Sequence, residues 1–221
     1  QTKFLFNPMD YYGQKLEMIS HSKKFVLITP KKTGSVSLVD ALKPYIDIQK
    51  IEYQKNLSED CYDFYESNAK ILSKHNRATD YKDFIVNKKY ITFGSIRNPF
   101  DCIVSFWSFL KGTKHIDENC SFKSFLCNTQ GHPIENMKNQ NLLDSFIING
   151  KVVVKNYIKF EEIDDSFAEF CQHTKIPLTK LPHKNKSKRL HYSHYYDDEC
   201  IQVAKEKFAR DIQYFKYEFK A

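Results

Sequence analysis

The sequence predicts an α/β fold in which a mostly parallel sheet is flanked by helices. Three segments carry this prediction, because each combines a short run of β-branched and aromatic residues with a following stretch of helical apolar spacing. These strand-then-helix units cover residues 24–45, 90–112 and 151–174. Strands that alternate with helices favour parallel pairing, with helices covering both faces of the sheet.

The first unit begins with residues 24–29, Lys-Phe-Val-Leu-Ile-Thr, which are typical of a buried strand ending at Pro30. After a turn through Gly34, residues 37–45 place apolar side chains on one side at helical spacing, with Pro44 as a breaker near the end. The unit is therefore predicted to be a strand, a tight turn and a helix.

The second unit predicts a strand over residues 90–96 and then a helix with Asn98 as its N-cap and Pro99 at its first position. Apolar residues at i, i+3, i+4 and i+7 form the buried stripe of this helix. Gly112 is expected to end it.

The third unit predicts a strand over residues 151–160 and a helix over residues 161–174. A last helix is predicted over residues 197–214, because three acidic residues open it, as suits a helix N-terminus. Residues 175–196 are poor in aliphatic side chains and rich in Lys, His and Tyr. They predict a long loop, and such loops in compact domains are often functional.

Length and charge set the class of protein. At 221 residues the chain fits one domain, residues 1–221, and no apolar run approaches the ~20 residues that cross a bilayer, so a soluble chain is expected. The net charge of +7 favours anionic partners. A cytoplasmic location is favoured, with a Golgi-lumenal catalytic fragment as the alternative if an upstream anchor was removed before Gln1.

Neither a metal site nor a redox pair is expected. The six cysteines include no C-x-x-C pair and no tight cluster with histidine. His191 and His194 have i, i+3 spacing, but this pair alone does not indicate a metal site.

The spacing of the six glycines excludes two common nucleotide motifs. No pair fits G-x-x-x-x-G-K-[ST] or G-x-G-x-x-G, so the usual P-loop and dinucleotide-binding fingerprints are absent. Residues 29–38, Thr-Pro-Lys-Lys-Thr-Gly-Ser-Val-Ser-Leu, remain as a strand-to-helix turn whose backbone amides, Gly34 and Lys32 could cradle a phosphate. The alternative is a plain connecting turn with chance lysines.

A second segment, residues 96–105, places an arginine at a strand end and a serine on the polar face of the next helix. Arg97 can fork onto a phosphate while Ser105 donates beside it. The alternative is a helix-capping ion pair between Arg97 and Asp101.

Together the two segments resemble the sulfotransferase superfamily that uses 3′-phosphoadenosine 5′-phosphosulfate (PAPS), in particular the carbohydrate O-sulfotransferase branch with the heparan 2-O and chondroitin enzymes. Residues 31–38 are similar to the branch's P-K-T-G-G-T-S-L-like loop, and residues 96–105 to its V-R-N-P-[FY]-D-R-L-x-S-like segment. Weaker similarity follows in the family's order at residues 74–79, 140–143, 159–163, 181–187 and 211–217.

The resemblance implies a strand, phosphate loop and helix that bind the donor without a Walker A sequence. It implies that Lys32 stabilises the leaving oxygen and that His75 is the general base. It also implies that donor-binding residues come from the loop, the second segment and a basic lid: Lys32, Thr33, Gly34, Ser35, Val36, Ser37, Leu38, Arg97, Ser105, Lys186 and Ser187.

Four positions depart from the family pattern. Lys31 replaces a proline, Val36 replaces a hydroxyl residue, and Cys102 and Lys159 each replace an arginine. The number of donor contacts, and with it the affinity for the donor, is therefore expected to be lower than in the family.

The sequence thus predicts transfer of a sulfuryl group from PAPS to a hydroxyl acceptor, a carbohydrate or a small molecule, with 3′-phosphoadenosine 5′-phosphate (PAP) as the product. No metal, nucleic-acid partner or membrane segment is expected. Two alternatives remain: a nucleic-acid-binding domain that uses the +7 charge, and a divergent kinase-like nucleotide enzyme.

Overall fold

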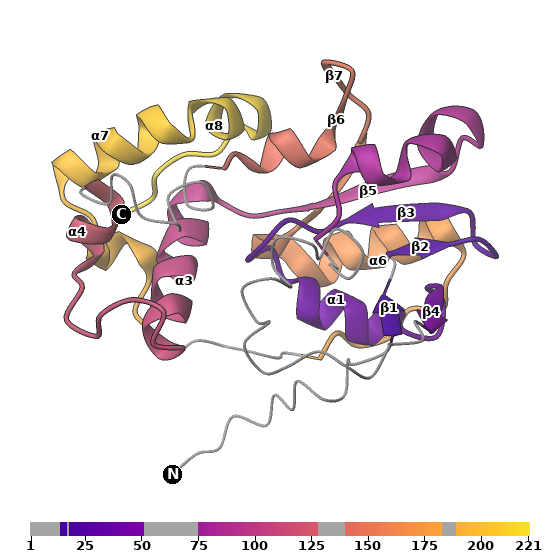
Figure 1. Ribbon diagram of the computed structural model, residues 1–221, viewed down its shortest axis with the longest axis horizontal. Helices are drawn as coiled ribbons and strands as arrows, with labels where there is room; N and C mark the ends of the chain where they lie inside the picture. The colour runs from indigo at the N-terminus through magenta and orange to yellow at the C-terminus, as the bar shows by residue number, and fades with distance from the viewer. Residues whose placement is uncertain (1–13, 17, 51–74, 128–139, 183–188) are drawn as a thin grey trace, which may run out of the picture.

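The computed structural model describes residues 14–16, 18–50, 75–127, 140–182 and 189–221. At its centre lies a four-stranded sheet (Figure 1) whose strands are, in spatial order, β2 (Ile19–Ser20), β3 (Phe25–Ile28), β5 (Ile91–Ile96) and β8 (Asn156–Lys159). The last three are parallel, while β2 pairs antiparallel with β3 at the edge. The prediction of a mixed α/β fold with a mostly parallel sheet is confirmed.

Two short antiparallel pairs accompany this sheet. One joins β1 (Gln14–Leu16) to β4 (Ile48–Lys50), and the other joins β6 (Ile147–Ile148) to β7 (Lys151–Val152). Both lie outside the central sheet, which therefore keeps its three parallel strands together.

The first predicted helix forms, with shifted ends. Helix α1 spans Ser35–Leu42, so it begins two residues before the predicted start and ends before Pro44. Gly34 is its N-cap in the left-handed conformation, with φ 87°, and the helix can begin directly after it. Pro44 lacks the N–H that the next helical turn requires, so the helix stops ahead of it.

The second predicted unit is confirmed at both ends of its helix. Helix α3 spans Pro99–Gly112, and the side chain of its N-cap, Asn98, accepts a hydrogen bond of 3.0 Å from the Phe100 amide. This bond satisfies one of the amides that have no acceptor within the helix.

The prediction of a single strand over residues 151–160 is wrong. Strand β7 ends at Val152, and a separate strand, β8, begins at Asn156. Asn149 and Gly150 have φ values of 50° and 75°, and they turn the chain into the β6–β7 hairpin before it reaches the sheet. The helix predicted next starts with a 3₁₀ turn, η7 (Phe160–Glu162), and continues as α6 (Ile163–Thr174).

The last predicted helix is two helices, α7 (Asp198–Lys207) and α8 (Ala209–Phe215). The chain bends at Phe208, which has φ −111° and ψ 23° and whose side chain is buried among residues of α3 and α7. Tertiary packing of one aromatic residue therefore overrides the continuous helical pattern. The N-cap of α7 is Asp197, which accepts a 2.8 Å hydrogen bond from the Cys200 amide.

Both faces of the central sheet are covered. On one face α1 and α6 contribute Leu38, Leu42 and Phe170 to a cluster with strand residues. On the other face lie the 3₁₀ segments η4 (Ala78–Tyr81) and η6 (Leu142–Phe146), and a π-helical turn, η5 (Asp83–Asn87), follows η4.

A separate apolar cluster joins α3 to α7, with α4 (Phe122–Cys127) and the 3₁₀ segment η8 (Tyr192–Tyr195) packed against them. Figure 1 shows α3, α4 and α7 together beyond one end of the sheet. Within the described part of the chain, no helix is both long and apolar enough to span a membrane.

Candidate functional site

The carboxyl ends of the three parallel strands meet at one edge of the sheet. The loop after β3 carries Lys32, the residue after β5 is Arg97, and the residue after β8 is Phe160. Arg97 joins all three, because its Nη1 donates a 2.9 Å hydrogen bond to the Lys32 carbonyl and its guanidinium lies 3.8 Å above the Phe160 ring. This edge is where parallel α/β sheets bind ligands.

The loop between β3 and α1 contains two residues in the left-handed region. Lys32 has φ 70° and Gly34 has φ 87°. A side chain at Gly34 would also meet Ile163 at 3.0 Å and Phe160 at 3.1 Å. The first amides of α1 have no acceptor within the helix, and no side chain caps them at Gly34, so this end of the helix suits an anion electrostatically.

The Thr33 side chain is committed to holding this loop. Its hydroxyl donates to the Pro30 carbonyl at 2.7 Å and lies 2.5 Å from the Ser95 hydroxyl on β5. Thr33 is 1% exposed. Its contribution to an anion site would therefore come from its backbone.

The remaining predicted loop residues lie on the first turns of α1. Ser35 is buried, whereas Val36 and Ser37 are half-buried. The Leu38 side chain is fully buried in the core, and its amide donates a 3.3 Å hydrogen bond to the Gly34 carbonyl. Leu38 therefore supports the loop from beneath.

Arg97 forms the ion pair that the sequence offered as an alternative to phosphate binding. Its Nε and Nη2 donate to Asp101 Oδ2 at 2.8 and 2.6 Å. Nη1 lies 3.3 Å from the Ser105 hydroxyl, so the two residues predicted to bind the 3′-phosphate are adjacent. Contacts among the described residues engage four of the five N–H groups of Arg97 and leave one on Nη2.

Asp101 is shared between two arginines. Its Oδ1 accepts a hydrogen bond from Nη2 of Arg189, to which the sequence assigned no role. Within the described residues, Arg189 Nε is buried without a hydrogen-bond partner. Two guanidinium groups around one carboxylate leave a net positive charge here. Nothing in the spacing of residues 101 and 189 signals this contact.

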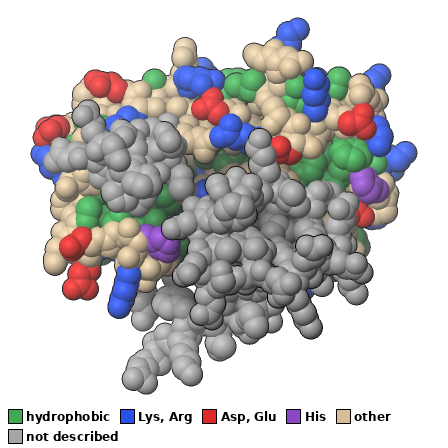
Figure 2. All heavy atoms as spheres, viewed as in Figure 1, with side chains coloured by type: hydrophobic (Ala, Val, Ile, Leu, Met, Phe, Trp, Pro, Cys, Tyr) green, Lys and Arg blue, Asp and Glu red, His purple; other side chains and the backbone are tan. Residues whose placement is uncertain are grey.

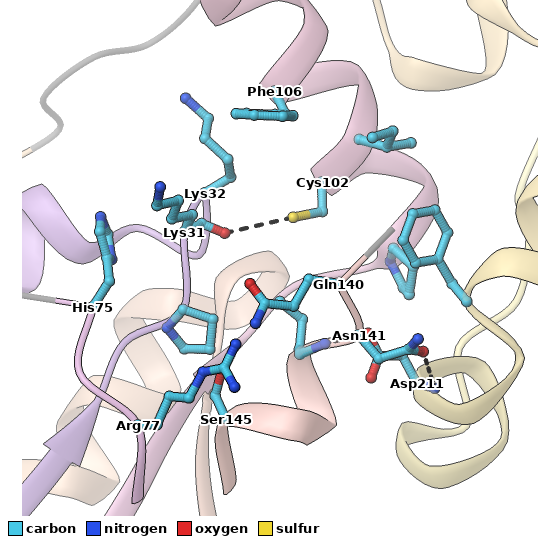
Figure 3. Close-up of a pocket in the computed structure, with 15 residues that line it drawn as sticks. Lys31, Lys32, His75, Arg77, Cys102, Phe106, Gln140, Asn141, Ser145 and Asp211 are labelled. Carbon is cyan, nitrogen blue, oxygen red and sulfur yellow. Dashed lines mark hydrogen bonds between the residues drawn. The ribbon is translucent and has the colours of Figure 1, made fainter. Parts of the chain in front are cut away.

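An open pocket of about 100 Å³ lies beside the loop (Figure 3). Its lining combines cationic and polar side chains with apolar ones, among them Pro30, Pro99 and Phe106. The polar lining comes from the loop, from the segment before η4, from η6 and its approach, and from α8: Lys31, Lys32, His75, Arg77, Gln140, Asn141, Ser145 and Asp211. Sequence reasoning assigned roles to Lys32 and His75 and missed the other polar residues.

His75 lies in the wall of this pocket with a defined orientation. Its Nδ1 is 2.7 Å from the Thr29 carbonyl oxygen. A carbonyl only accepts, so Nδ1 carries the proton and Nε2 of the neutral ring is the nitrogen with a lone pair. The backbone at the end of β3 therefore selects the tautomer in which Nε2 can take up a proton.

The ammonium group of Lys32 lies 4.2 Å from the centroid of the Phe109 ring on α3, a cation–π contact. Lys32 and His75 both line the pocket, and Figure 3 shows them on its loop side. The two residues predicted to be catalytic thus belong to one pocket.

Burial shifts the pKa values of two titratable groups that line the pocket. Burial raises the pKa of the Cys102 thiol to about 12, so the thiol stays protonated and weakly donates toward the Lys31 carbonyl at 3.7 Å. Burial also raises the pKa of Asp211 to about 6, although the amides of Leu142 and Leu143 lower it by donating to the carboxylate. The sequence did not predict a raised pKa for either group.

Lys186 and Ser187, the predicted lid residues, lie outside the described residues. In the described part of the chain, no three His, Cys, Asp or Glu side chains gather as they would around a metal ion.

Comparison with family models, with curated proteins and with solved structures finds no match to this chain.

Proposed function

We propose that this protein is a PAPS-dependent sulfotransferase that transfers a sulfuryl group to a hydroxyl acceptor, a carbohydrate or a small molecule. One observation carries the proposal. Lys32, on a left-handed loop before a helix N-terminus, and His75, whose Nε2 has a lone pair in the neutral ring, line the same pocket. Both residues come from motifs that resemble the family's.

The donor end of the proposed site is the loop and the first turn of α1. Amides at a helix N-terminus and a nearby lysine suit the 5′-phosphosulfate. Arg97, with one N–H left, and Ser105 beside it suit the 3′-phosphate. The other four N–H groups of Arg97 are already engaged, so we expect this contact to be weaker than one made by an uncommitted arginine.

In the proposed reaction the acceptor oxygen attacks sulfur, the bond from sulfur to the bridging phosphate oxygen breaks, and PAP leaves. Negative charge grows on the bridging oxygen, where the Lys32 ammonium stabilises it. The acceptor proton passes to Nε2 of His75, while the Thr29 carbonyl holds Nδ1–H. In-line positioning supplies much of the remaining rate enhancement.

Direct binding separates this proposal from the two alternatives. Calorimetric titration with PAP, ATP and a mixed DNA oligonucleotide should show a strong preference for PAP. A kinase-like enzyme would prefer ATP, and a nucleic-acid-binding domain would prefer the oligonucleotide. On the face shown in Figure 2, the basic side chains of the described residues are interspersed with acidic ones, unlike the continuous basic stripe of a nucleic-acid surface.

Substitution of His75 tests the chemistry once an acceptor is found by screening sulfate transfer to glycans and small hydroxyl compounds. His75→Ala should lower transfer by roughly 10²–10⁴-fold, the usual range for general acid–base catalysis, and leave PAP affinity nearly intact. His115→Ala is the matched control, because His115 is exposed just after α3. Parallel loss of PAP binding and transfer in His75→Ala would instead assign His75 to the donor site.

A further inference from the structure

We propose that Arg97 is a positioning residue for Lys32. Its guanidinium, anchored by Asp101, holds Lys32 in the left-handed backbone conformation and thereby fixes where the ammonium group stands. The consequence for catalysis rests on the proposed function, because a fixed ammonium matters only if Lys32 acts on the leaving oxygen. The coupling between the two residues is a property of the fold and can be measured without catalysis.

The backbone of Lys32 is the strained part of the loop. With φ 70° it occupies a region that side chains other than Gly, Asn and Asp rarely adopt. Such a residue persists only where its surroundings over-determine its conformation. Arg97 contacts this residue's backbone directly, because its Nη1 donates a 2.9 Å hydrogen bond to the Lys32 carbonyl.

Arg97 is rigid enough to impose that conformation. Its side chain is 7% exposed. The planar guanidinium lies over the Phe160 ring, 3.8 Å from the ring centroid, and Nε and Nη2 both donate to Asp101. A guanidinium held on one face and along one edge has little freedom to follow a moving carbonyl. The hydrogen bond therefore forms only when the Lys32 backbone adopts the conformation that directs its carbonyl at Arg97.

Helix α3 anchors the arrangement from both ends of Lys32. Asp101, on the first turn of α3, holds Arg97 and is itself held by Arg189. Phe109, near the end of the same helix, lies 4.2 Å beneath the Lys32 ammonium. The backbone of Lys32 is thus fixed through Asp101 and Arg97, and its side chain through Phe109.

A stability cycle tests the coupling. In the wild-type background, Lys32→Gly should unfold at a temperature roughly 2–4 °C above that of Lys32→Ala, because glycine adopts positive φ without the steric cost. In an Arg97→Met background, which keeps apolar packing against Phe160 and loses the donors, the loop can relax and this difference should vanish. Ser105→Ala is the matched control, because Ser105 meets the same Nη1 but not Lys32, and there the difference should persist.

A difference that survives unchanged in Arg97→Met, or that is missing in the wild-type background, would overturn the proposal. If Arg97→Met does not fold, Asp101→Asn replaces it in the cycle, since it frees Arg97 from its anchor while keeping both arginines. Under the proposal, Asp101→Asn should shrink the difference between glycine and alanine at position 32 by more than half.

Catalysis supplies a second readout that a merely structural role would not move. At saturating PAPS, where a weaker donor contact no longer limits the rate, Asp101→Asn should lower kcat about tenfold, because the ammonium loses its place. An unchanged kcat would overturn the positioning role. If instead the wild-type protein binds no PAP yet shows the coupling, the proposed function fails and the coupling between Arg97 and Lys32 stands.

Discussion

Replacing Asp211 with asparagine should remove a specific pH dependence from the free energy of unfolding. The Asp211 carboxyl is fully buried, and burial raises its pKa from 3.8 to about 6. Between these two values the folded protein keeps the proton while the unfolded chain loses it. Stability contributed by this group is therefore fully present below pH 3.8 and is lost as the pH rises through about 6. A difference of about two pKa units corresponds to about 3 kcal/mol.

The assay is urea unfolding of wild-type protein and of Asp211→Asn at half-unit steps from pH 4 to pH 8. Other carboxyl groups titrate in both proteins, so they cancel in the difference between the two free energies of unfolding. That difference, wild type minus variant, should fall by about 2.4 kcal/mol across pH 4 to 7, because part of the effect is already lost at pH 4, and stay level above. Asparagine also places an amide group against the Leu142 or Leu143 N–H, which adds an offset that does not depend on pH.

A difference that rises with pH would refute this reasoning. It would show that the two amides, which donate at 2.7 and 2.9 Å to separate carboxylate oxygens, stabilise the charged form by more than burial destabilises it. A level difference would show that the two effects cancel. Because Asp211 lines the pocket, PAP titrations at pH 5 and pH 7.5 would then show whether its charge reaches the proposed donor site.

Three further substitutions test the fold and the loop. Gly94→Ala should lower stability by about 1–3 kcal/mol, because its Cβ would lie 2.7 Å from the Phe146 ring, whereas Gly112→Ala, with nothing within 4 Å, should be neutral or stabilising; thermal melts of the pair decide. Asn98→Ala should lower stability by about 1 kcal/mol by removing the α3 N-cap, and a urea midpoint equal to wild type would contradict this. Lys32→Ala should abolish transfer and weaken PAP binding less, so wild-type turnover would exclude Lys32 as the leaving-group residue.

Local patterns predicted the elements whose signals are contained in a few adjacent residues. The Asn98-Pro99 start and the Gly112 end of α3 follow from side-chain capping and φ preferences alone. The break at Phe208 and the β6–β7 hairpin could not be predicted this way. Both depend on where a side chain is buried or on a turn that competes with a continuous apolar run, and periodicity does not carry that information.

The site divides along the same line. Sequence motifs placed Lys32 and Arg97 after the ends of strands and Ser105 on the helix that follows, and a parallel sheet necessarily brings such strand ends together. Asp101 and Arg189, which form an ion pair, lie 88 positions apart in the sequence. The buried Asp211 accepts hydrogen bonds from amides 69 and 68 positions away. Neither contact has a sequence signature. The orientation of His75 likewise depends on a backbone carbonyl 46 residues away.

Strand order explains why so much depends on Arg97. With β5 between β3 and β8, the residue after β5 lies next to the ends of both neighbours, and a guanidinium is long and planar enough to hydrogen-bond to one and stack on the other. A ligand that contacts Arg97 at this edge therefore meets a side chain that already holds Lys32 and Asp101. A change in activity at Arg97 therefore has two sources, lost ligand contact and a relaxed Lys32 loop. The comparison of glycine with alanine at position 32 separates them without a ligand, because it responds to the loop alone.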